Sequence, residues 1–186
     1  GRTLIVIDDG WTSAPAWSEV RNAANAAIAQ AERARAPIFM LFTAPSTRPR
    51  DPGEALTAAD AKSRVQRLEP QPWRPDRADA AARLARTEGN FDRIVWITDG
   101  LSDAGAETLA AELQRRGPVT ARIPEQTARG IVSGSVTPQG VEFRRAWGRT
   151  SAQKRVAAAG EGFRVAEALL RRDENVALYD LTWELM

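Results

Sequence analysis

Residues 1–125 alternate short apolar runs with longer amphipathic stretches. Four runs are almost continuously apolar, as is typical of strands buried on both faces of a parallel sheet; they cover Leu4–Ile7, Ile38–Thr43, Ile94–Thr98 and Val119–Ile123. Helical patterns lie between them, over Pro15–Arg35, Gly53–Leu68, Asp76–Thr87 and Ala104–Arg116, and Gly117 then gives a C-cap signal. Repeated strand–helix alternation predicts an α/β fold with a doubly wound, mainly parallel sheet.

From about Arg129 the pattern changes to strand-like spacing. "GIVSGSVTPQGVEFRRAW" predicts two strands joined by a turn at residues 138–140, and residues 176–184 also alternate in the manner of a strand. Phe163–Arg172 has high helix propensity, so a helix competes there with the strand that we favour. We therefore expect an α/β domain over residues 1–125 and a small β-rich subdomain, resembling part of a β-sandwich, over residues 126–186.

Composition narrows the chemistry that the chain can perform. Of 186 residues, 43% are hydrophobic and 27% are charged, which is typical of a globular protein. There is no cysteine and no histidine, which excludes disulfides, thiolate metal sites and a Ser-His-Asp triad. Any metal would have to be a hard cation with oxygen ligands. The net charge of +2 and the scattered arginines form no recognisable nucleic-acid-binding module.

The chain contains no apolar run of the length that crosses a bilayer, so we expect no direct membrane contact by these residues. It begins with Gly1, and no leader precedes the first predicted strand. We therefore expect a fragment of a longer protein.

Acidic and hydroxyl side chains gather where two predicted strands end. Asp8 and Asp9 directly follow the first strand, Asp99 follows the strand "RIVWI", and Thr12 and Ser13 come soon after the first pair. Because the carboxyl ends of parallel strands share one edge of a sheet, neighbouring strands would bring these side chains together. Such an oxygen-lined crevice suits Mg²⁺, Mn²⁺ or Ca²⁺.

The pair of motifs "VIDDGWTS" and "VWITDG" resembles the von Willebrand factor A-type domain. In that family a metal-ion-dependent adhesion site opens with Asp-x-Ser-x-Ser and closes with Asp-Gly. Within the superfamily the chain is most similar to bacterial BatA-like proteins, also called aerotolerance regulators, and the tail "GEGFRVAEALL" resembles their β-rich segment. The resemblance implies a Rossmann-like fold, protein binding, and a parent chain anchored in the bacterial inner membrane, on an undetermined side.

Residue by residue, the resemblance implies a degenerate metal site. Asp8 matches the opening aspartate, Asp99 matches the closing one, and Thr12 stands in for the second serine. Gly10 occupies the first serine position and has no side-chain oxygen. The family's threonine falls in "PQPWRPDRAD", where Asp76 is either a substitute or an N-cap of the next helix. The implied ligands of a weak or vacant cation site are therefore Asp8, Thr12 and Asp99.

Aromatic residues on the same predicted edge are candidates for partner binding. Trp11 lies beside the carboxylates and Trp73 lies in a proline-rich loop; with Asp9 they form the predicted contact set. The alternative is that each tryptophan covers a loop against the core. Four arginines would form a basic rim on this edge, namely Arg48, Arg50, Arg74 and Arg77.

The same motif has three other interpretations. Structurally, Asp9-Gly10 is a common turn, and Thr12 or Ser13 is a common N-cap before Pro15. The haloacid dehalogenase pattern Asp-x-Asp-Gly-Thr fits in neither register. A phosphate-binding loop needs a glycine-rich turn and, for a P-loop, a lysine, whereas "DDGWTSAP" has one glycine, no lysine and two acids that repel phosphate. The sequence thus predicts a non-catalytic protein-interaction module of an envelope protein; the alternative is a Mg²⁺-dependent phosphoester hydrolase that uses the same carboxylates.

Overall fold

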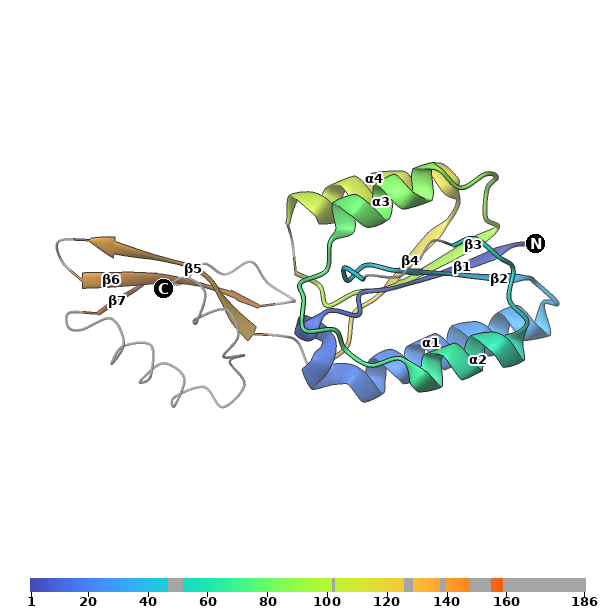
Figure 1. Ribbon diagram of the computed structural model, residues 1–186, viewed down its shortest axis with the longest axis horizontal. Coiled ribbons are helices and arrows are strands. Elements are labelled where there is room, and N and C mark those ends of the chain that lie inside the picture. Colours follow the sequence, from blue (N-terminus) through green and yellow to red (C-terminus); the bar gives the residue numbers. More distant parts are fainter. Residues whose placement is uncertain (47–51, 102, 126–128, 138–139, 148–154, 159–186) are drawn as a thin grey trace.

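A four-stranded parallel sheet forms the centre of the α/β unit (Figure 1). The computed structural model describes residues 1–46, 52–101, 103–125, 129–137, 140–147 and 155–158. The strands are β1 (Thr3–Ile7), β2 (Ile38–Phe42), β3 (Arg93–Ile97) and β4 (Val119–Arg122). They pair in the order β2-β1-β3-β4, so β1 and β3 are neighbours. Every residue of β1 and β2 is buried, which explains their continuously apolar sequences.

Helices cover both faces of the sheet, with α1 and α2 on one face and α3 and α4 on the other (Figure 1). Their bounds are α1 (Trp17–Arg33), α2 (Ala58–Arg67), α3 (Arg77–Ala85) and α4 (Ala104–Arg116), and a 3-10 helix, η1 (Trp11–Ala16), precedes α1. The predicted α/β character is therefore confirmed, and each strand and helix expected within residues 1–125 is present. One expectation is wrong: β4 is mostly exposed and not buried on both faces.

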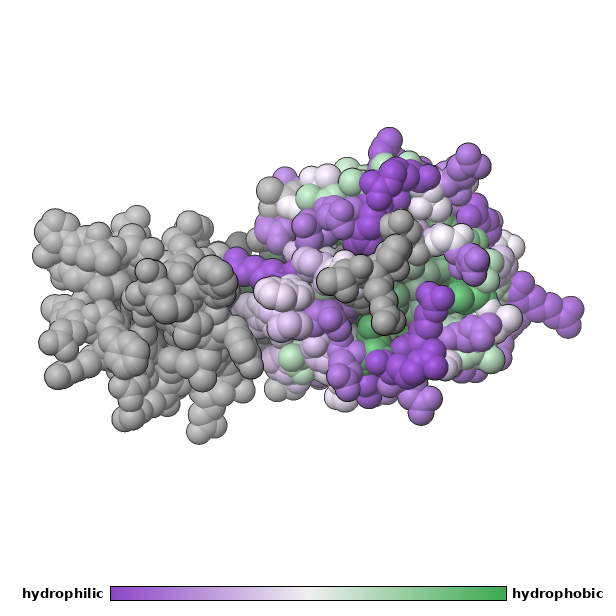
Figure 2. Space-filling view, viewed as in Figure 1, coloured by the Kyte–Doolittle hydropathy of each residue, from purple (hydrophilic) through white to green (hydrophobic). Residues whose placement is uncertain are grey.

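Alternate residues of each central strand divide the core into two layers. Ile5 and Ile7 of β1 pack with apolar residues of α1 and α2. Leu4 and Val6, which point to the opposite face, pack with apolar residues of α3 and α4. The surface of the helices that Figure 2 shows is mostly hydrophilic, and hydrophobic residues come to the surface between the two helix layers. Burial on both faces leaves the strand ends as the natural place for polar chemistry.

The start of the first long helix differs from the prediction. A helix was expected from Pro15, but residues 11–16 form η1 and α1 begins at Trp17. The hydroxyls of Thr12 and Ser13 do not cap α1, because they bond to the Asp99 carboxylate and the Asp8 carbonyl instead. The N-cap interpretation of these two residues is therefore wrong, and the tight 3-10 turn carries both hydroxyls to the strand ends.

The other three helices begin with side-chain caps. Thr57 caps α2, Asp76 caps α3 and Asp103 caps α4, each accepting a hydrogen bond from the backbone N–H three residues on. A cap of this kind stabilises a helix by about 1 kcal/mol. For Asp76 the N-cap interpretation is confirmed.

A second sheet is antiparallel, in the order β5-β6-β7. It comprises β5 (Arg129–Thr137), β6 (Gly140–Trp147) and β7 (Arg155–Ala158), so the two strands expected in this part of the chain are present. Residues 159–186, including the strand-or-helix segment Phe163–Arg172, lie outside the described residues. A β-rich subdomain over 126–186, and a domain boundary near residue 125, therefore stay predictions.

Among the described residues, no helix has both the length and the apolar character needed to cross a membrane.

The turn between α4 and β4 requires a glycine. The N–H of Gly117 donates to the Leu113 carbonyl at 3.1 Å, which confirms the predicted C-cap. A Cβ atom at this position would lie 2.0 Å from the backbone oxygen of Phe91. That distance is far below any normal contact, so a side chain here would force the backbone apart.

We predict that Gly117→Ala lowers the free energy of unfolding by about 1–3 kcal/mol, because the added methyl group collides with rigid backbone. Gly53→Ala is the matched control, since nothing lies within 4 Å of a Cβ at Gly53. Urea unfolding followed by circular dichroism measures both variants, and an equal loss in both would contradict the explanation.

Candidate functional site

The ends of β1 and β3 bring two predicted site residues together. Ile7 pairs with Ile97, and the N–H of Asp8 donates to the Ile97 carbonyl at 2.9 Å. Asp8 is fully buried and Asp99 is 4% exposed. The Thr12 hydroxyl donates to Oδ2 of Asp99 at 2.5 Å. The three residues expected to hold a cation therefore lie at one buried point of the carboxyl edge.

A cation is already present at this point, because the side chain of Arg77 lies among the carboxylates and is only 2% exposed. Its Nη2 donates to Asp8 Oδ2 at 2.9 Å and to Asp99 Oδ1 at 2.5 Å. Nε donates to Asp8 Oδ2 at 3.2 Å, while Nη1 donates to Asp103 Oδ2 at 2.9 Å and to the Leu101 carbonyl at 3.3 Å. These bonds match the five N–H donors that a guanidinium possesses.

The carboxylates are satisfied as completely as the arginine. The second oxygen of Asp8 accepts a hydrogen bond from the Thr43 hydroxyl at 2.8 Å. Oδ1 of Asp99 also accepts from the N–H of Leu101 at 2.8 Å, and Oδ1 of Asp103 accepts from the N–H of Ala106 at 2.7 Å. Each carboxylate oxygen of the three aspartates thus has a partner. We call Asp8, Asp99, Asp103 and Arg77 the arginine–aspartate cluster; it is a closed polar network.

A close approach at Gly10 allows the arginine to reach the cluster. The loop that leads into α3 passes so near that a Cβ at Gly10 would lie 2.6 Å from the Trp73 carbonyl oxygen and 2.6 Å from Pro75 Cδ. The N–H of Trp11 donates to the same Trp73 carbonyl at 3.2 Å. The missing side chain at Gly10 therefore gives room to the segment that delivers Arg77.

Burial and charge act in opposite directions on these groups. Burial disfavours the charged guanidinium, but Asp8 and Asp99 outweigh it and raise the pKa of Arg77 above its already high ordinary value. Burial and the neighbouring Asp8 raise the pKa of Asp99, although Arg77 opposes them. The cluster therefore has a permanent positive charge and one carboxyl group that holds its proton more tightly than an exposed aspartate does.

The oxygens that would hold a divalent cation are engaged by this guanidinium. Asp8 and Asp99 present bonded oxygens to Arg77, and a second cation among them would be repelled by its charge. In the part of the chain that the structure describes, no group of three or more acidic side chains has the arrangement of a metal site. With Arg77 in place, Asp8, Thr12 and Asp99 do not fit a divalent cation.

The remaining predicted contact residues differ in accessibility. Asp9 is fully buried, and its Oδ1 accepts from the N–H of Ala44 at 2.9 Å, so its carboxylate faces inward. Trp11 is half-buried, whereas Trp73 is 57% exposed. Of the predicted contact set, only Trp73 offers a large exposed side chain.

The prediction of a basic rim is wrong for Arg77. Arg77 was expected at the surface with three other arginines, but it is buried because its five donors find acceptors at the strand ends. Arg74 is exposed, as a rim residue should be. Arg48 and Arg50 lie outside the described residues.

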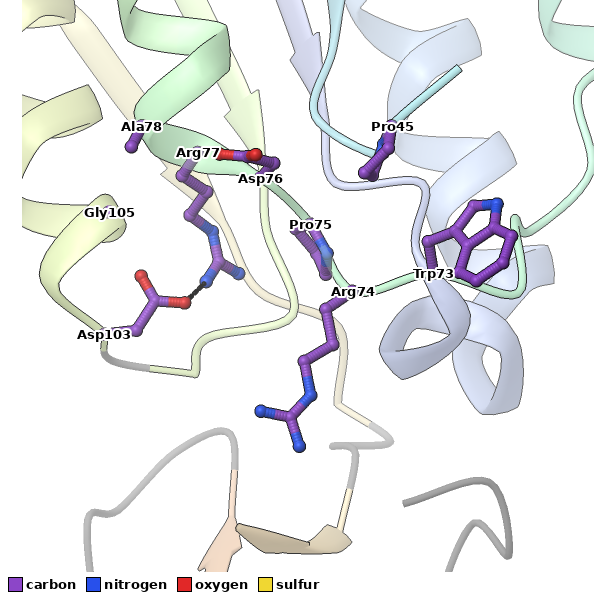
Figure 3. A pocket seen from close by; sticks show the side chains of 9 residues that line it. All are labelled: Pro45, Trp73, Arg74, Pro75, Asp76, Arg77, Ala78, Asp103 and Gly105. Atoms are coloured by element: carbon purple, nitrogen blue, oxygen red, sulfur yellow. Dashed lines mark hydrogen bonds and ion pairs between the residues drawn. The ribbon is translucent and has the colours of Figure 1, made fainter. Parts of the chain in front are cut away.

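An open groove of about 440 Å³ lies beside the cluster. Figure 3 shows Arg77 turned toward Asp103, Arg74 pointing away from that pair, and Trp73 beyond Pro75. The lining residues come mainly from the loop before α3 and from the starts of α3 and α4; they are Pro45, Trp73, Arg74, Pro75, Asp76, Arg77, Ala78, Asp103 and Gly105. The groove therefore has an aromatic end and a charged end.

Sequence reasoning missed Arg77 and Thr43 as members of the site. One available signal was charge balance, because two aspartates at adjacent buried strand ends require a nearby cation. Another was the position of Arg77, which directly follows the helix cap Asp76 in a loop expected at the same edge. Thr43 follows β2 as Asp8 follows β1, so the sheet order alone would have placed it here.

We predict that Arg77→Met lowers the free energy of unfolding by roughly 3–5 kcal/mol at neutral pH, because it leaves Asp8 and Asp99 buried without a counter-charge. Arg86→Met, at an exposed position where α3 ends, is the matched control and should change stability by less than about 0.5 kcal/mol. Urea unfolding measures both. Equal stability of the two variants would show that the cluster contributes nothing to folding.

The raised pKa of Asp99 predicts an unusual pH dependence. The folded state holds this proton more tightly than the unfolded chain does, so the contribution to stability is complete below the ordinary aspartate pKa of about 3.9 and is lost as pH rises through the folded value. The stability of the native protein minus that of Asp99→Asn should therefore fall with rising pH. Urea unfolding from pH 3 to pH 8 measures this difference, and a rise would mean that Arg77 outweighs burial.

Comparison with known proteins adds little to this geometry. No protein-family model matches the chain, and no curated protein matches it. Among solved structures, proximal thread matrix protein 1 from the mussel byssus matches in two crystal forms, at 14% and 16% sequence identity and a TM-score of 0.43 in each. The matches cover 65% and 64% of this chain but 36% and 37% of that one, so this chain spans little more than a third of its length. The fold class established here, α/β with a four-stranded parallel sheet, rests on the described sheet and helices.

Proposed function

We propose that the chain is a non-catalytic protein-interaction module that binds its partner at the carboxyl edge of the parallel sheet without a divalent cation. The observation that carries this proposal is the buried Arg77, which bonds to the carboxylates at the strand ends. The carboxyl edge is thereby folded around an internal ion pair. The side chains that a partner can reach there are those that line the groove beside the cluster.

The same observation weighs against catalysis by these carboxylates. A phosphoester hydrolase with Mg²⁺ would need the oxygens of Asp8 and Asp99 to bind the ion or to attack phosphorus. Both side chains are buried, and both bond to a guanidinium and to a hydroxyl or backbone group. A nucleophile or metal ligand held in this way is not available to a substrate.

The groove offers the side chains that protein partners commonly use. Trp73 is 57% exposed and lines the groove together with two prolines, Pro45 and Pro75 (Figure 3). Exposed tryptophan and arginine are over-represented among residues that dominate binding energy, and Arg74 is the next residue along the chain. We propose Trp73 as the anchor and Arg74 as its charged neighbour. Half-buried Trp11 is joined to Trp73 by a backbone hydrogen bond. Asp9 is left out because it faces inward.

The resemblance in "VIDDGWTS" and "VWITDG" supports a finer assignment to a von Willebrand A-like domain of a BatA-like protein. The two motifs lie on adjacent parallel strands, as such a domain requires. On this proposal the parent chain is anchored in a bacterial inner membrane and the partner is another envelope protein.

Trp73→Ala should remove partner binding and leave the fold intact, because the side chain is largely exposed. The measurement is affinity capture from detergent-solubilised envelope with immobilised native domain, followed by titration with the purified captured protein; the variant should weaken binding at least tenfold. Arg86→Ala, which alters an exposed arginine at the opposite end of α3, should bind normally.

Two further measurements distinguish the proposed metal-independent module from a metal-dependent one and from a hydrolase. Binding that persists in EDTA supports a metal-independent contact, whereas its loss in EDTA would contradict it. Hydrolysis of para-nitrophenyl phosphate that requires Mg²⁺ and disappears in Asp8→Asn would contradict the interaction module and support the hydrolase.

A further inference from the structure

The arginine–aspartate cluster is arranged as an ion site with its ion built into the chain. In the von Willebrand A-type domains that this chain resembles, oxygens from two adjacent strand ends and a nearby hydroxyl converge on a divalent cation. In this chain Asp8 and Asp99 converge on the Nη2 atom of Arg77, at 2.9 and 2.5 Å, and the Thr12 hydroxyl donates to Oδ2 of Asp99, the oxygen that Arg77 does not contact. The oxygen donors are retained, but they surround a nitrogen cation.

We propose that Arg77 is a permanent internal cation that excludes divalent metal from this edge. We further propose that Gly10, which has no side chain, leaves the room that Arg77 needs to reach the edge. This inference goes beyond the proposed function, because it concerns how the edge is held and not which partner it binds.

The balance of charge at the strand ends differs when an arginine takes the place of a divalent ion. A divalent ion balances two carboxylates, whereas one guanidinium balances one, so the substitution leaves the buried pair Asp8 and Asp99 with an excess of negative charge. The third acid, Asp103, has a side chain that is 51% exposed, so water hydrates and screens its charge.

Geometry supports the role of Gly10. A side chain there would place Cβ 2.6 Å from the Trp73 carbonyl oxygen and 2.9 Å from the Pro75 backbone nitrogen, and both are backbone atoms that cannot turn away. Two residues after Pro75 the chain reaches Arg77. Position 10 and position 77 are thus coupled through one short loop, and a larger residue at position 10 would push the guanidinium away from the strand ends.

The first test is a titration of metal against thermal unfolding. Native protein, Arg77→Met and Arg77→Ala are unfolded in EDTA and in millimolar Mg²⁺, Mn²⁺ or Ca²⁺. We expect no change in Tm for the native protein and a rise of roughly 5 °C or more for at least one Arg77 variant, because the freed oxygens then bind the ion in the folded state only. Adding Asp99→Asn to the responsive variant should remove the rise.

Two outcomes would overturn the proposal. One is a metal-dependent rise in Tm of the native protein that Asp8→Asn abolishes, since that would place a divalent ion beside Arg77. The other is an absence of any response in folded Arg77 variants, since the guanidinium would then not be what excludes metal. If neither variant folds in metal or in EDTA, calorimetric titration of native protein with Mn²⁺ decides, because measurable binding at the cluster contradicts the proposal.

The second test is a double-mutant cycle between positions 10 and 77. Gly10→Ala should lower the Tm of the native protein by several degrees, and by less than half as much in the Arg77→Met background, where the loop need no longer hold a guanidinium in place. Gly53→Ala is the control for the added methyl group. Equal losses in both backgrounds would show that Gly10 does not act through Arg77. Neither test uses the binding partner. Failure of this inference is therefore distinguishable from failure of the proposed function, which the Trp73→Ala binding experiment tests.

Discussion

The buried ion pair between Arg77 and the aspartates at the strand ends is the interaction on which the carboxyl edge of this fold depends. Removing a guanidinium and two carboxylates from water carries a desolvation penalty of several kcal/mol per ion, so the arrangement is stable only with near-complete hydrogen bonding. The structure meets that condition, since the five donors of Arg77 and the oxygens of Asp8 and Asp99 all have partners. The cluster also joins β1 and β3 to the starts of α3 and α4.

This requirement follows from how the sheet is buried. Both faces of β1 pack against helices, so a polar residue that directly continues the strand enters the interior and not the solvent. Asp8 and Asp9 illustrate the consequence, because both are fully buried but make different bonds. Asp8 meets Arg77, whereas Asp9 accepts from the N–H of Ala44 and fixes the chain after β2. Adjacent identical residues thus perform separate tasks.

The sequence predicts well what depends on local pattern and poorly what depends on a distant partner. Apolar runs identified β1, β2 and β3, and the less apolar β4 was found by the strand–helix alternation. Asp76 and Gly117 were correctly placed at helix ends by their residue types. The start of α1 was misplaced because Thr12 and Ser13 bond across the fold and not along the helix. Arg77 was assigned to the surface because most arginines are exposed. Its acidic neighbours come from the strand ends, which meet the α3 loop only in three dimensions.

A closed cluster beside an open groove limits the side chains that can take part in recognition at this edge. An ion with a vacant coordination position recognises a carboxylate by direct bonding, whereas a guanidinium with all donors engaged has no remaining capacity for an incoming group. In the function proposed here, recognition rests on the rim, where Trp73 supplies apolar area and Arg74 a charge. The cluster's contribution is rigidity, because the loop that carries both rim residues passes over Gly10 and ends at Arg77. Affinity at such a rim is gained by holding exposed side chains in place before the partner arrives.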